Sequence, residues 1–314
     1  MANRFNDEET AHGIPEAVFP LWFSDISNFE VVKSHTRIVY RVQADGKTCY
    51  LKVIPESDQK DAHPLDRTRY DRSTHFARHL VEAGAPIARP MVSSQGNAVE
   101  VQPFSNVEMV VQVSSEVVGT EVSAECRDTN VFSRCGTALA RFHKAAESYP
   151  HTSQFDTGAW EAEWTETKQI MAGDDPVLTA EFERIDAWLN ENTPLPGGKG
   201  ITHGDTNVFN FIDDGSRVSI IDFDSPMFTW YATDLAYPFR NDKTMSPAER
   251  AELWSAFQSG YNAIRPIDID YETIRWMLRQ WMLVTYVSYA DMPDHHKKPY
   301  LKRWYASIED PTRW

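Results

Sequence analysis

The feature that most constrains how this chain folds is a pair of short β-rich runs that form a strand-turn-strand at 208–222, within the stretches 201–212 and 218–224, with Asp213-Asp-Gly-Ser216 as the turn. An Asp-Gly pair between two such runs is typical of a hairpin. Polar side chains interrupt the runs at fixed spacing, as an H-x-D-x-x-x-x-N pattern followed by a D-x-D pattern. These residues are His203, Asp205, Asn210, Asp222 and Asp224. We therefore expect a hairpin that gathers acids, an amide and a histidine at one end.

The position of the turn predicts which residues face each other. If Asp214-Gly215 forms a two-residue turn, Asn210 pairs with Ser219. Asp222 then lies beyond Asn210, alongside the loop that holds Asp205. Two carboxylates and one amide are therefore expected to converge.

This convergence has the composition that phosphoryl transfer requires. Magnesium prefers carboxylate and amide oxygens and leaves its other positions to water and phosphates, so Asn210 and Asp222 are the candidate metal ligands. A separate carboxylate must orient the attacking hydroxyl and take its proton. Asp205 is the candidate base.

Three further polar residues are expected to support this loop. His203 is expected to hold the loop by hydrogen bonding rather than to move protons. Asp224 either aids the metal or hydrogen-bonds to the loop. Asp234 is expected to cap a helix and to brace the loop.

The first third of the chain is rich in strand-forming residues. Residues 37–54 predict a hairpin, a short strand is expected at 29–32, and two more strands within 97–118. Residues 66–83 carry the pattern of a helix. A small lobe of strands with one helix follows from this order.

A lysine in this first third is the candidate phosphate ligand. Pairing about the turn at Asp45-Gly46 places Lys52 level with Val39, next to the connection that precedes that strand. A nucleotide needs such a cation. Because the connection lacks glycine, the hydroxyls of Ser34 and Thr36 and the backbone N–H groups are expected to contact the phosphates.

From Gly119 onward the pattern is mostly helical. The helical segments expected are 132–143, 159–171, 176–191 and much of 246–308. We therefore predict an α+β protein with two lobes, 1–118 and 119–314.

Composition narrows the class of protein. The 314 residues include 46 acidic and 31 basic ones, for a net charge of −15, which disfavours nucleic acid and fits either an ordinary acidic surface or a cationic substrate. No apolar run is long enough for a membrane helix, and the polar start is unlike a signal peptide. Three scattered cysteines argue against a disulfide framework or a zinc site. A cytoplasmic location is expected, and the oligomeric state cannot be read.

These motifs resemble those of the aminoglycoside phosphotransferase and homoserine kinase-like family, which includes choline kinase-like enzymes and has a protein-kinase-like fold. The most specific ones are His203-Gly-Asp205 with Asn210, Asp222-Phe-Asp224 and Asp234-Leu-Ala236. Supporting ones are Tyr50-Leu-Lys52-Val-Ile54, Pro86-Ile-Ala-Arg-Pro90, Val117-Val-Gly119 and Leu139-Ala-Arg-Phe-His143. Together they extend over nearly the whole chain.

The resemblance implies a bilobal fold, with a small antiparallel sheet and one helix in the N-lobe and a larger, mainly helical C-lobe. It implies ATP and Mg²⁺ as cofactors and a small molecule with a hydroxyl as acceptor. Carried over by position, it makes Lys52 a phosphate ligand, Asp205 the base, and Asn210 and Asp222 the magnesium ligands. The adenine-binding hinge is implied at 112–117, with contacts from Gln112, Ser114 and Glu116.

One position departs from the family pattern. Where the N-lobe helix usually carries a glutamate that pairs with the lysine, this chain has Ser73. Asp66, Asp71 and Glu82 are the other candidates for that pair. Either one of these acids replaces the glutamate, or Lys52 is held otherwise.

Three functions fit these residues: a small-molecule kinase, a serine/threonine protein kinase of the same fold, and a nucleotide-binding protein impaired in catalysis. Only 11 residues separate Asp222 from Asp234, too few for a platform that docks extended peptides, which favours a small acceptor. The serine at position 73 motivates the third function, whereas the presence of Lys52 and Asp205 argues against it. A binuclear metallophosphatase would need further His and Asp clusters, which the sequence lacks.

A stripe of aromatic residues near the C-terminus has two interpretations. Its members are Trp276, Trp281, Tyr286 and Tyr289. They form core packing, or some of them wall the acceptor site, where ring faces would attract an ammonium group. The second interpretation suits an amino alcohol or an aminoglycoside.

Overall fold

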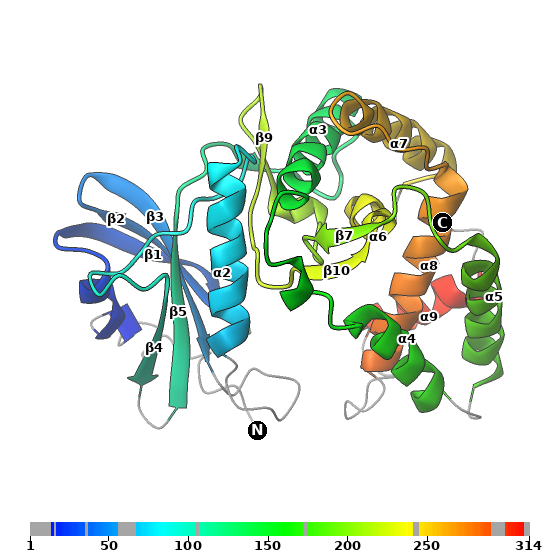
Figure 1. Cartoon of the computed structure of the whole chain (residues 1–314), viewed down its shortest axis with the longest axis horizontal. Helices are drawn as coiled ribbons and strands as arrows, with labels where there is room; N and C mark the ends of the chain where they lie inside the picture. The colour runs from blue at the N-terminus through cyan, green and yellow to red at the C-terminus, as the bar shows by residue number, and fades with distance from the viewer. Residues whose placement is uncertain are drawn as a thin grey trace. The chain divides into compact units, whose positions relative to one another are not determined.

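A computed structural model describes residues 14–15, 17–34, 37–55, 67–104, 107–171, 175–240, 245–289 and 299–310. The chain divides into two compact units, 1–118 and 119–314, which Figure 1 draws in blue to green and in green to red. Each unit is described by itself.

The first unit is built on a five-stranded antiparallel sheet of order β1-β2-β3-β5-β4. Its elements are η1 (Phe19–Leu21), β1 (Ile26–Ser34), β2 (Ile38–Ala44), β3 (Lys47–Pro55), α2 (Arg67–Glu82), β4 (Val99–Phe104) and β5 (Val107–Ser115). The five strands and the helix between the third and fourth are those predicted. Lys52 pairs with Val39, as the turn at Asp45-Gly46 predicts.

Alternation along the strands gives the sheet two different faces. One face buries Tyr40, Leu51 and Val111 beneath the N-terminal segment that contains Phe19. The opposite face carries Ile54, Val99 and Val110, which pack with Tyr70 of α2, and Figure 1 shows α2 lying along this sheet. Lys52 lies two residues before Ile54 in the same strand, so it belongs to the α2 face.

The second unit is mainly helical. Its helices are α3 (Thr129–Ala146), α4 (Ala159–Ile170), α5 (Pro176–Asn192), α6 (Tyr231–Ala236), α7 (Pro247–Asn262), α8 (Tyr271–Ser288) and α9 (Pro299–Glu309), with η3 (Thr152–Gln154), η4 (Val208–Asn210) and η5 (Tyr237–Phe239). The longer ones begin at polar N-caps such as Asp128, Asp175 and Asp270, whose carboxylates accept a bond from the first turn. No helix in the described ranges is both long and apolar enough to cross a membrane.

Two glycines let α3 and α7 approach closely, as Figure 1 shows. A Cβ atom on Gly136 would lie 1.9 Å from the carbonyl oxygen of Phe257, and one on Gly260 would lie 1.9 Å from that of Ser133. The contact fixes α3, which carries His143 toward the middle of the unit.

Short strands complete the second unit. β6 (Thr120–Glu121), β8 (Phe211–Asp213) and β9 (Val218–Ile220) form one sheet, and β7 (Lys199–Thr202) pairs with β10 (Met227–Trp230). The predicted strand-turn-strand around Asp214-Gly215 is therefore present.

The predicted register of this second hairpin is wrong by two residues. Ile212, rather than Asn210, pairs with Ser219. Asp214 does not sit in a two-residue turn, because its carboxylate accepts bonds from the backbone N–H groups of Ser216 and Arg217 and closes a four-residue loop.

Candidate active site

The loop between β7 and η4 holds the predicted base. Asp205 lies three residues after the end of β7, and its carboxylate is partly exposed, with a side-chain exposure of 41%. The amide Nδ2 of Asn210 donates to the backbone oxygen of Asp205 at 2.7 Å and lies 3.5 Å from the carboxylate oxygen Oδ2. The structure therefore brings these two predicted site residues together.

A fully buried carboxylate braces this loop from below. Asp234 of α6 accepts hydrogen bonds from the backbone N–H of His203 at 2.6 Å and of Gly204 at 3.0 Å. The hydroxyl of Thr206 donates to the backbone oxygen of Asp234 at 2.7 Å. Asp234 thus fixes the backbone on both sides of the turn that presents Asp205. The prediction that it caps a helix is wrong, because Asp234 lies within α6, whose N-cap is Trp230.

The glycine of this turn cannot carry a side chain without displacement. Gly204 has φ of +78°, and a Cβ atom there would lie 2.0 Å from the backbone oxygen of Ser225. The loop and the segment after β9 therefore pass closer than any other residue type permits.

His203 links the same two segments. Its Nδ1 accepts from the backbone N–H of Asp205 at 3.2 Å, so its Nε2–H donates to the backbone oxygen of Ile221 at 2.9 Å. The ring lies against Phe223, with centroids 4.8 Å apart. These contacts support the structural role expected of His203.

The candidate metal ligands lie on adjacent segments. The backbone N–H of Ile221 donates to the backbone oxygen of Asn210 at 3.0 Å, so Asp222 follows directly on the residue paired with Asn210. Asp222 adopts a left-handed backbone with φ of +70°, an uncommon conformation that Asp tolerates better than most residues. Asp224 is buried, with 6% exposure.

The donor set of these two residues fits magnesium. Asn210 uses its Nδ2 toward Asp205, which leaves the amide oxygen, and Asp222 contributes a carboxylate. Mg²⁺ typically takes one or two such oxygens and completes its shell with water and phosphate. Within the described ranges, no cluster of three or more His, Cys, Asp or Glu residues could hold a metal ion. A metal bound by Asn210 and Asp222 would therefore take its other ligands from water and phosphate.

One residue behind the site was not predicted to act there. His143 of α3 is fully buried, and its Nε2–H donates to Asp234 at 3.0 Å. The hydroxyl of Tyr261 lies 2.8 Å from Nδ1 and also receives a bond from Arg265 at 3.2 Å, so Tyr261 donates to the histidine. Burial lowers the pKa of His143, although Asp234 opposes the shift. A histidine on the apolar face of the predicted helix was the available signal.

A second unpredicted residue contacts the base itself. Arg240, which follows η5, donates to the carboxylate oxygen Oδ1 of Asp205. Its guanidinium lies 5.1 Å from the ring centroid of Tyr237 and 4.8 Å from that of Trp281. No sequence pattern marked this arginine.

The aromatic stripe divides between two surroundings. Trp276 stacks on Trp188 at 5.4 Å, and Arg279 lies 3.8 Å above its ring, so this part packs. Tyr286 is buried, as the packing interpretation predicts. Trp281 instead lies beside Arg240, and hence near the base.

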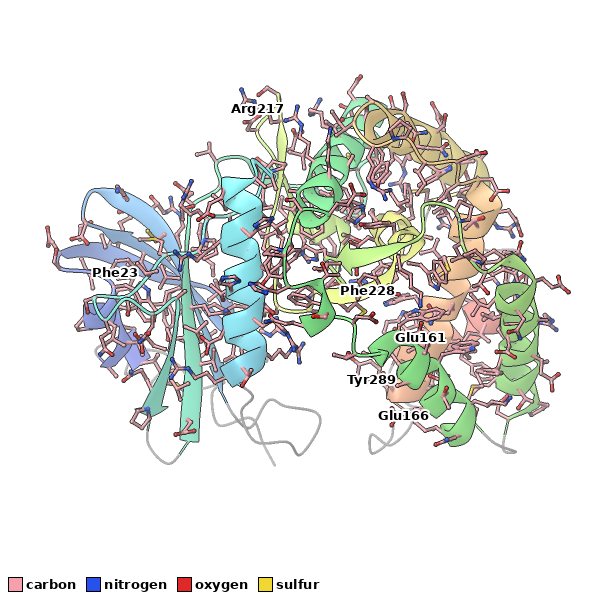
Figure 2. All side chains as sticks on the ribbon, in the orientation of Figure 1. Phe23, Glu161, Glu166, Arg217, Phe228 and Tyr289 are labelled. Atoms are coloured by element: carbon pink, nitrogen blue, oxygen red, sulfur yellow. The ribbon has the colours of Figure 1, made fainter. Side chains whose placement is uncertain are left out.

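Acidic residues of α4 lie in the neighbourhood of these rings. The helix packs against α8 and β10, and Figure 2 labels Glu161 and Glu166 on it. Burial raises the pKa of the Glu163 carboxyl group, and the charge of Glu166 adds to this shift, although part of the residue reaches solvent. Burial raises the pKa of Tyr237, while Arg240 lowers it and the charge of Glu163 raises it further.

The candidate nucleotide residues lie in the first unit. Lys52 pairs with Val39 on one side and with Gln112 of β5 on the other. Gln112 donates its Nε2–H to the hydroxyl of Thr74 in α2 at 2.9 Å. Ser34 ends β1 and pairs with Ile38.

The other residues predicted to contact the nucleotide are Ser114, Glu116 and Thr36. Ser114 bridges to Pro90 through the backbone, and the carboxylate of Glu116 accepts from Arg41 at 3.3 Å. Thr36 lies outside the described residues.

The acids considered as partners of Lys52 are also placed, except Asp66, which lies outside the described residues. Ser73 is buried and donates its hydroxyl to the backbone oxygen of Arg69 at 2.9 Å. Asp71 pairs with Arg67 at 3.2 Å. Glu82 lies at the end of α2, where it lines a shallow surface pocket.

Comparison with solved structures agrees with the fold. An amicoumacin kinase in complex with AMP-PNP, Ca²⁺ and Ami has a TM-score of 0.74 at 18% identity, over 98% of this chain and 95% of that one. A microcompartment-associated aminopropanol kinase has a TM-score of 0.68 at 17% identity, over 95% and 94%. An aminoglycoside phosphotransferase from Alicyclobacillus acidocaldarius has a TM-score of 0.65 at 16% identity, over 95% and 94%. The predicted α+β, protein-kinase-like fold is confirmed.

Sequence comparison identifies the family. The amicoumacin kinase of Bacillus subtilis (strain 168) is 25% identical over 203 residues, which are 63% of this chain and 58% of that relative. The chain thus matches less than two thirds of the relative's length. The APH model, described as the phosphotransferase enzyme family, matches residues 30–267, more than half of the chain. The chain therefore belongs to the phosphotransferase enzyme family.

Proposed function

We propose that this enzyme transfers the γ-phosphoryl group of ATP to a hydroxyl of a small molecule, with Asp205 as the base. The observation that carries the proposal is the junction of Asp205 and Asn210 with the segment that leads into Asp222. A base and two oxygen ligands held within one set of backbone hydrogen bonds have the composition that phosphoryl transfer requires.

The roles of the second unit follow from this junction. The carboxylate of Asp205 accepts the proton of the acceptor hydroxyl as its oxygen attacks the γ-phosphorus and the bond to ADP breaks. Asn210 and Asp222 would hold Mg²⁺, which supplies charge neutralisation for the phosphates when bound. His203 and Asp234 keep the loop rigid, and Asp224 either aids the metal or supports the loop.

The first unit is proposed to bind the nucleotide. Lys52 would pair with the phosphates, helped by hydroxyls of Ser34 and Thr36, and the segment 112–117 would contact the adenine. Relatives of this fold have been solved with AMP-PNP and Ca²⁺ and with ADP, which supports a nucleotide and a divalent cation as cofactors. Beside Lys52, the side chain of Gln112 bonds to the buried Thr74 of α2.

The acceptor is proposed to carry an amino group as well as a hydroxyl. Glu163 on α4 offers negative charge near Tyr237, and Glu166 lies three positions further along the same helix. Burial, with a smaller contribution from the charge of Glu166, raises the pKa of Glu163, and a cation there would favour its charged form. Two of the structural neighbours are named for amino-bearing acceptors, aminopropanol and aminoglycosides.

A phosphoryl-acceptor screen tests the proposal. The enzyme is incubated with γ-labelled ATP and Mg²⁺ together with amino alcohols, amicoumacin, aminoglycosides, homoserine or neutral sugars, and a generic protein substrate is included. Labelled product with one amino-bearing acceptor is the expected result. Label on the protein substrate would instead favour a protein kinase, and transfer neither to any acceptor nor to water would contradict the proposal.

A further inference from the structure

Arg240 binds the carboxylate of the proposed base, Asp205, at the oxygen that Asn210 does not approach. Arg240 donates to Oδ1 of Asp205, while the amide of Asn210 approaches Oδ2 at 3.5 Å. The arginine side chain is 9% exposed and the aspartate side chain 41%. A mostly buried cation thus holds one oxygen of a carboxylate whose other oxygen has, among the described residues, only the long contact with Asn210.

Aromatic rings hold this arginine in place. Its guanidinium lies over Tyr237, three residues earlier in the chain, and over Trp281 of α8. Trp281 is supported in turn by the ring of Trp304 in α9, with centroids 5.9 Å apart. A planar guanidinium stacked on rings loses few further conformations when it bonds to a carboxylate. Arg240 is therefore well suited to fix the orientation of the Asp205 carboxylate.

We propose that Arg240 is the positioning residue of the reaction: it occupies Oδ1 of Asp205 and so directs Oδ2 to take the acceptor's proton. This inference rests on the proposed function. In the step, the acceptor O–H proton moves to Oδ2, the acceptor oxygen forms its bond to the γ-phosphorus, and the bond from that phosphorus to the leaving ADP oxygen breaks. Arg240 neither gains nor loses a proton.

The same geometry bears on the aromatic stripe. The ring faces of Tyr237 and Trp281 that could attract an ammonium group near the base already face the guanidinium of Arg240. An acceptor ammonium at those faces would bring two cations together. The amino group of the acceptor is therefore expected at the α4 carboxylates rather than on these two ring faces.

Steady-state kinetics on Arg240 variants test the proposal. The acceptor is the one found in the screen or, where none is phosphorylated, water, followed as hydrolysis of Mg²⁺–ATP. Arg240→Ala is expected to lower kcat on the order of 10- to 100-fold, because a misplaced catalytic group loses about this much. The KM values for ATP and for the acceptor should stay close to those of the wild type. Arg275→Ala on the surface of α8, which removes an i,i+3 pair with Glu272, is the matched control and should keep wild-type kinetics.

Chemical rescue separates positioning from a merely structural role. Millimolar guanidinium should restore part of the lost kcat of Arg240→Ala, whereas equal NaCl should not, and thermal unfolding in the same buffers reports on folding. Arg240→Lys should recover less than free guanidinium does, since an ammonium lacks the planar fork. In an Asp205→Asn background, Arg240→Ala should add little further loss, as expected for residues that act as a unit.

Several outcomes would overturn the inference. An active wild type whose kcat is unchanged by Arg240→Ala, or whose KM for the acceptor alone rises, would remove the positioning role. The positioning role would also be removed if the fold-loss in kcat of the double variant equalled the product of the losses in Asp205→Asn and Arg240→Ala. A wild type that transfers phosphoryl groups neither to any acceptor nor to water would overturn the proposed function, and this inference with it.

Discussion

The two Asp-Gly hairpins of this protein show how differently similar sequences behave. In the first unit, Asp45 and Gly46 both have positive φ and form the two-residue turn, and seven residue pairs follow between β2 and β3. In the second unit, only three pairs join β8 to β9, and the turn opens into a four-residue loop. Long strands therefore fix the first register, whereas a local side chain decides the second.

The two aspartates differ in where their carboxylates bond. Asp45 reaches back to the start of the unit, where its carboxylate accepts from the hydroxyl of Ser24 at 2.7 Å and the N–H of Asp25 at 2.9 Å. Asp214 turns onto its own loop and accepts from the N–H groups of Ser216 and Arg217, both at 2.7 Å. The turn of the first hairpin is thus bonded to a segment about twenty residues earlier in the chain, whereas the turn of the second hairpin bonds only within its own loop through Asp214.

The largest expected effect in this comparison lies at the end of the second hairpin. Asp222→Ala removes a proposed metal ligand, and we expect turnover to fall on the order of 10²- to 10³-fold, as for lost electrostatic stabilisation of a transition state. Titration of activity with Mg²⁺ and of binding with Mn²⁺ in the presence of ATP checks this. If the variant reached half-maximal activity at the same Mg²⁺ concentration as the wild type, the assignment of Asp222 as a metal ligand would be contradicted.

A smaller loss is expected where the loop and the hairpin meet. Gly204→Ala places a methyl group against the backbone of Ser225 at a positive φ, so the free energy of unfolding should fall by about 1–3 kcal/mol and activity should fall with it. Gly96→Ala is the matched control, because Gly96 also has positive φ but no atom within 4 Å of the added Cβ. Equal losses in the two variants, measured by denaturant unfolding, would contradict a close contact at Gly204.

The brace behind the loop predicts a dependence of stability on pH. Burial lowers the pKa of His143 below its usual value of 6.5, so the unfolded chain takes up a proton at this residue before the folded chain does. The free energy of unfolding should therefore fall as pH drops below about 6.5, down to the lower folded pKa. His143→Gln should lack this component in unfolding curves measured at several pH values. An identical pH dependence in the variant and the wild type would remove His143 as its source.

The smallest effects are expected at the two turns themselves. Gly46→Ala should cost about 1 kcal/mol of unfolding free energy, since alanine tolerates the positive φ poorly, and should leave kinetics unchanged. Asp214→Ala should speed amide hydrogen exchange in β9 with little change in global stability. If Asp214→Ala instead left exchange at Val218 and Ile220 unaltered, its carboxylate would not set that register.

The sequence allowed much of the fold to be predicted, for identifiable reasons. Alternation of apolar residues and the turn at Asp45-Gly46 determined the pairing of Lys52 with Val39, and long amphipathic segments marked the helices. The register around Asp214 was missed because a side-chain bond to the backbone competes with a strand pairing of only three residues. Such local competition leaves no trace in hydrophobic periodicity.

The candidate site was predicted best where its residues belong to short motifs. Asp205 and Asn210 lie five positions apart, and Asp222 lies just beyond the hairpin that follows Asn210. Arg240 is 35 positions from Asp205, and His143 is 91 positions from Asp234. Their roles depend on how helices pack in the second unit, which single-sequence patterns do not encode.

The central claim, that Asp205 is the base of phosphoryl transfer from ATP, is tested most directly by separating rate from nucleotide affinity in Asp205→Asn. Transfer from γ-labelled ATP to the best acceptor should fall about 10²-fold or more, while calorimetry shows nearly wild-type binding of ATP. Asp268→Asn, an exposed substitution before α8, should match the wild type in both measurements. Wild-type transfer by Asp205→Asn would contradict the claim.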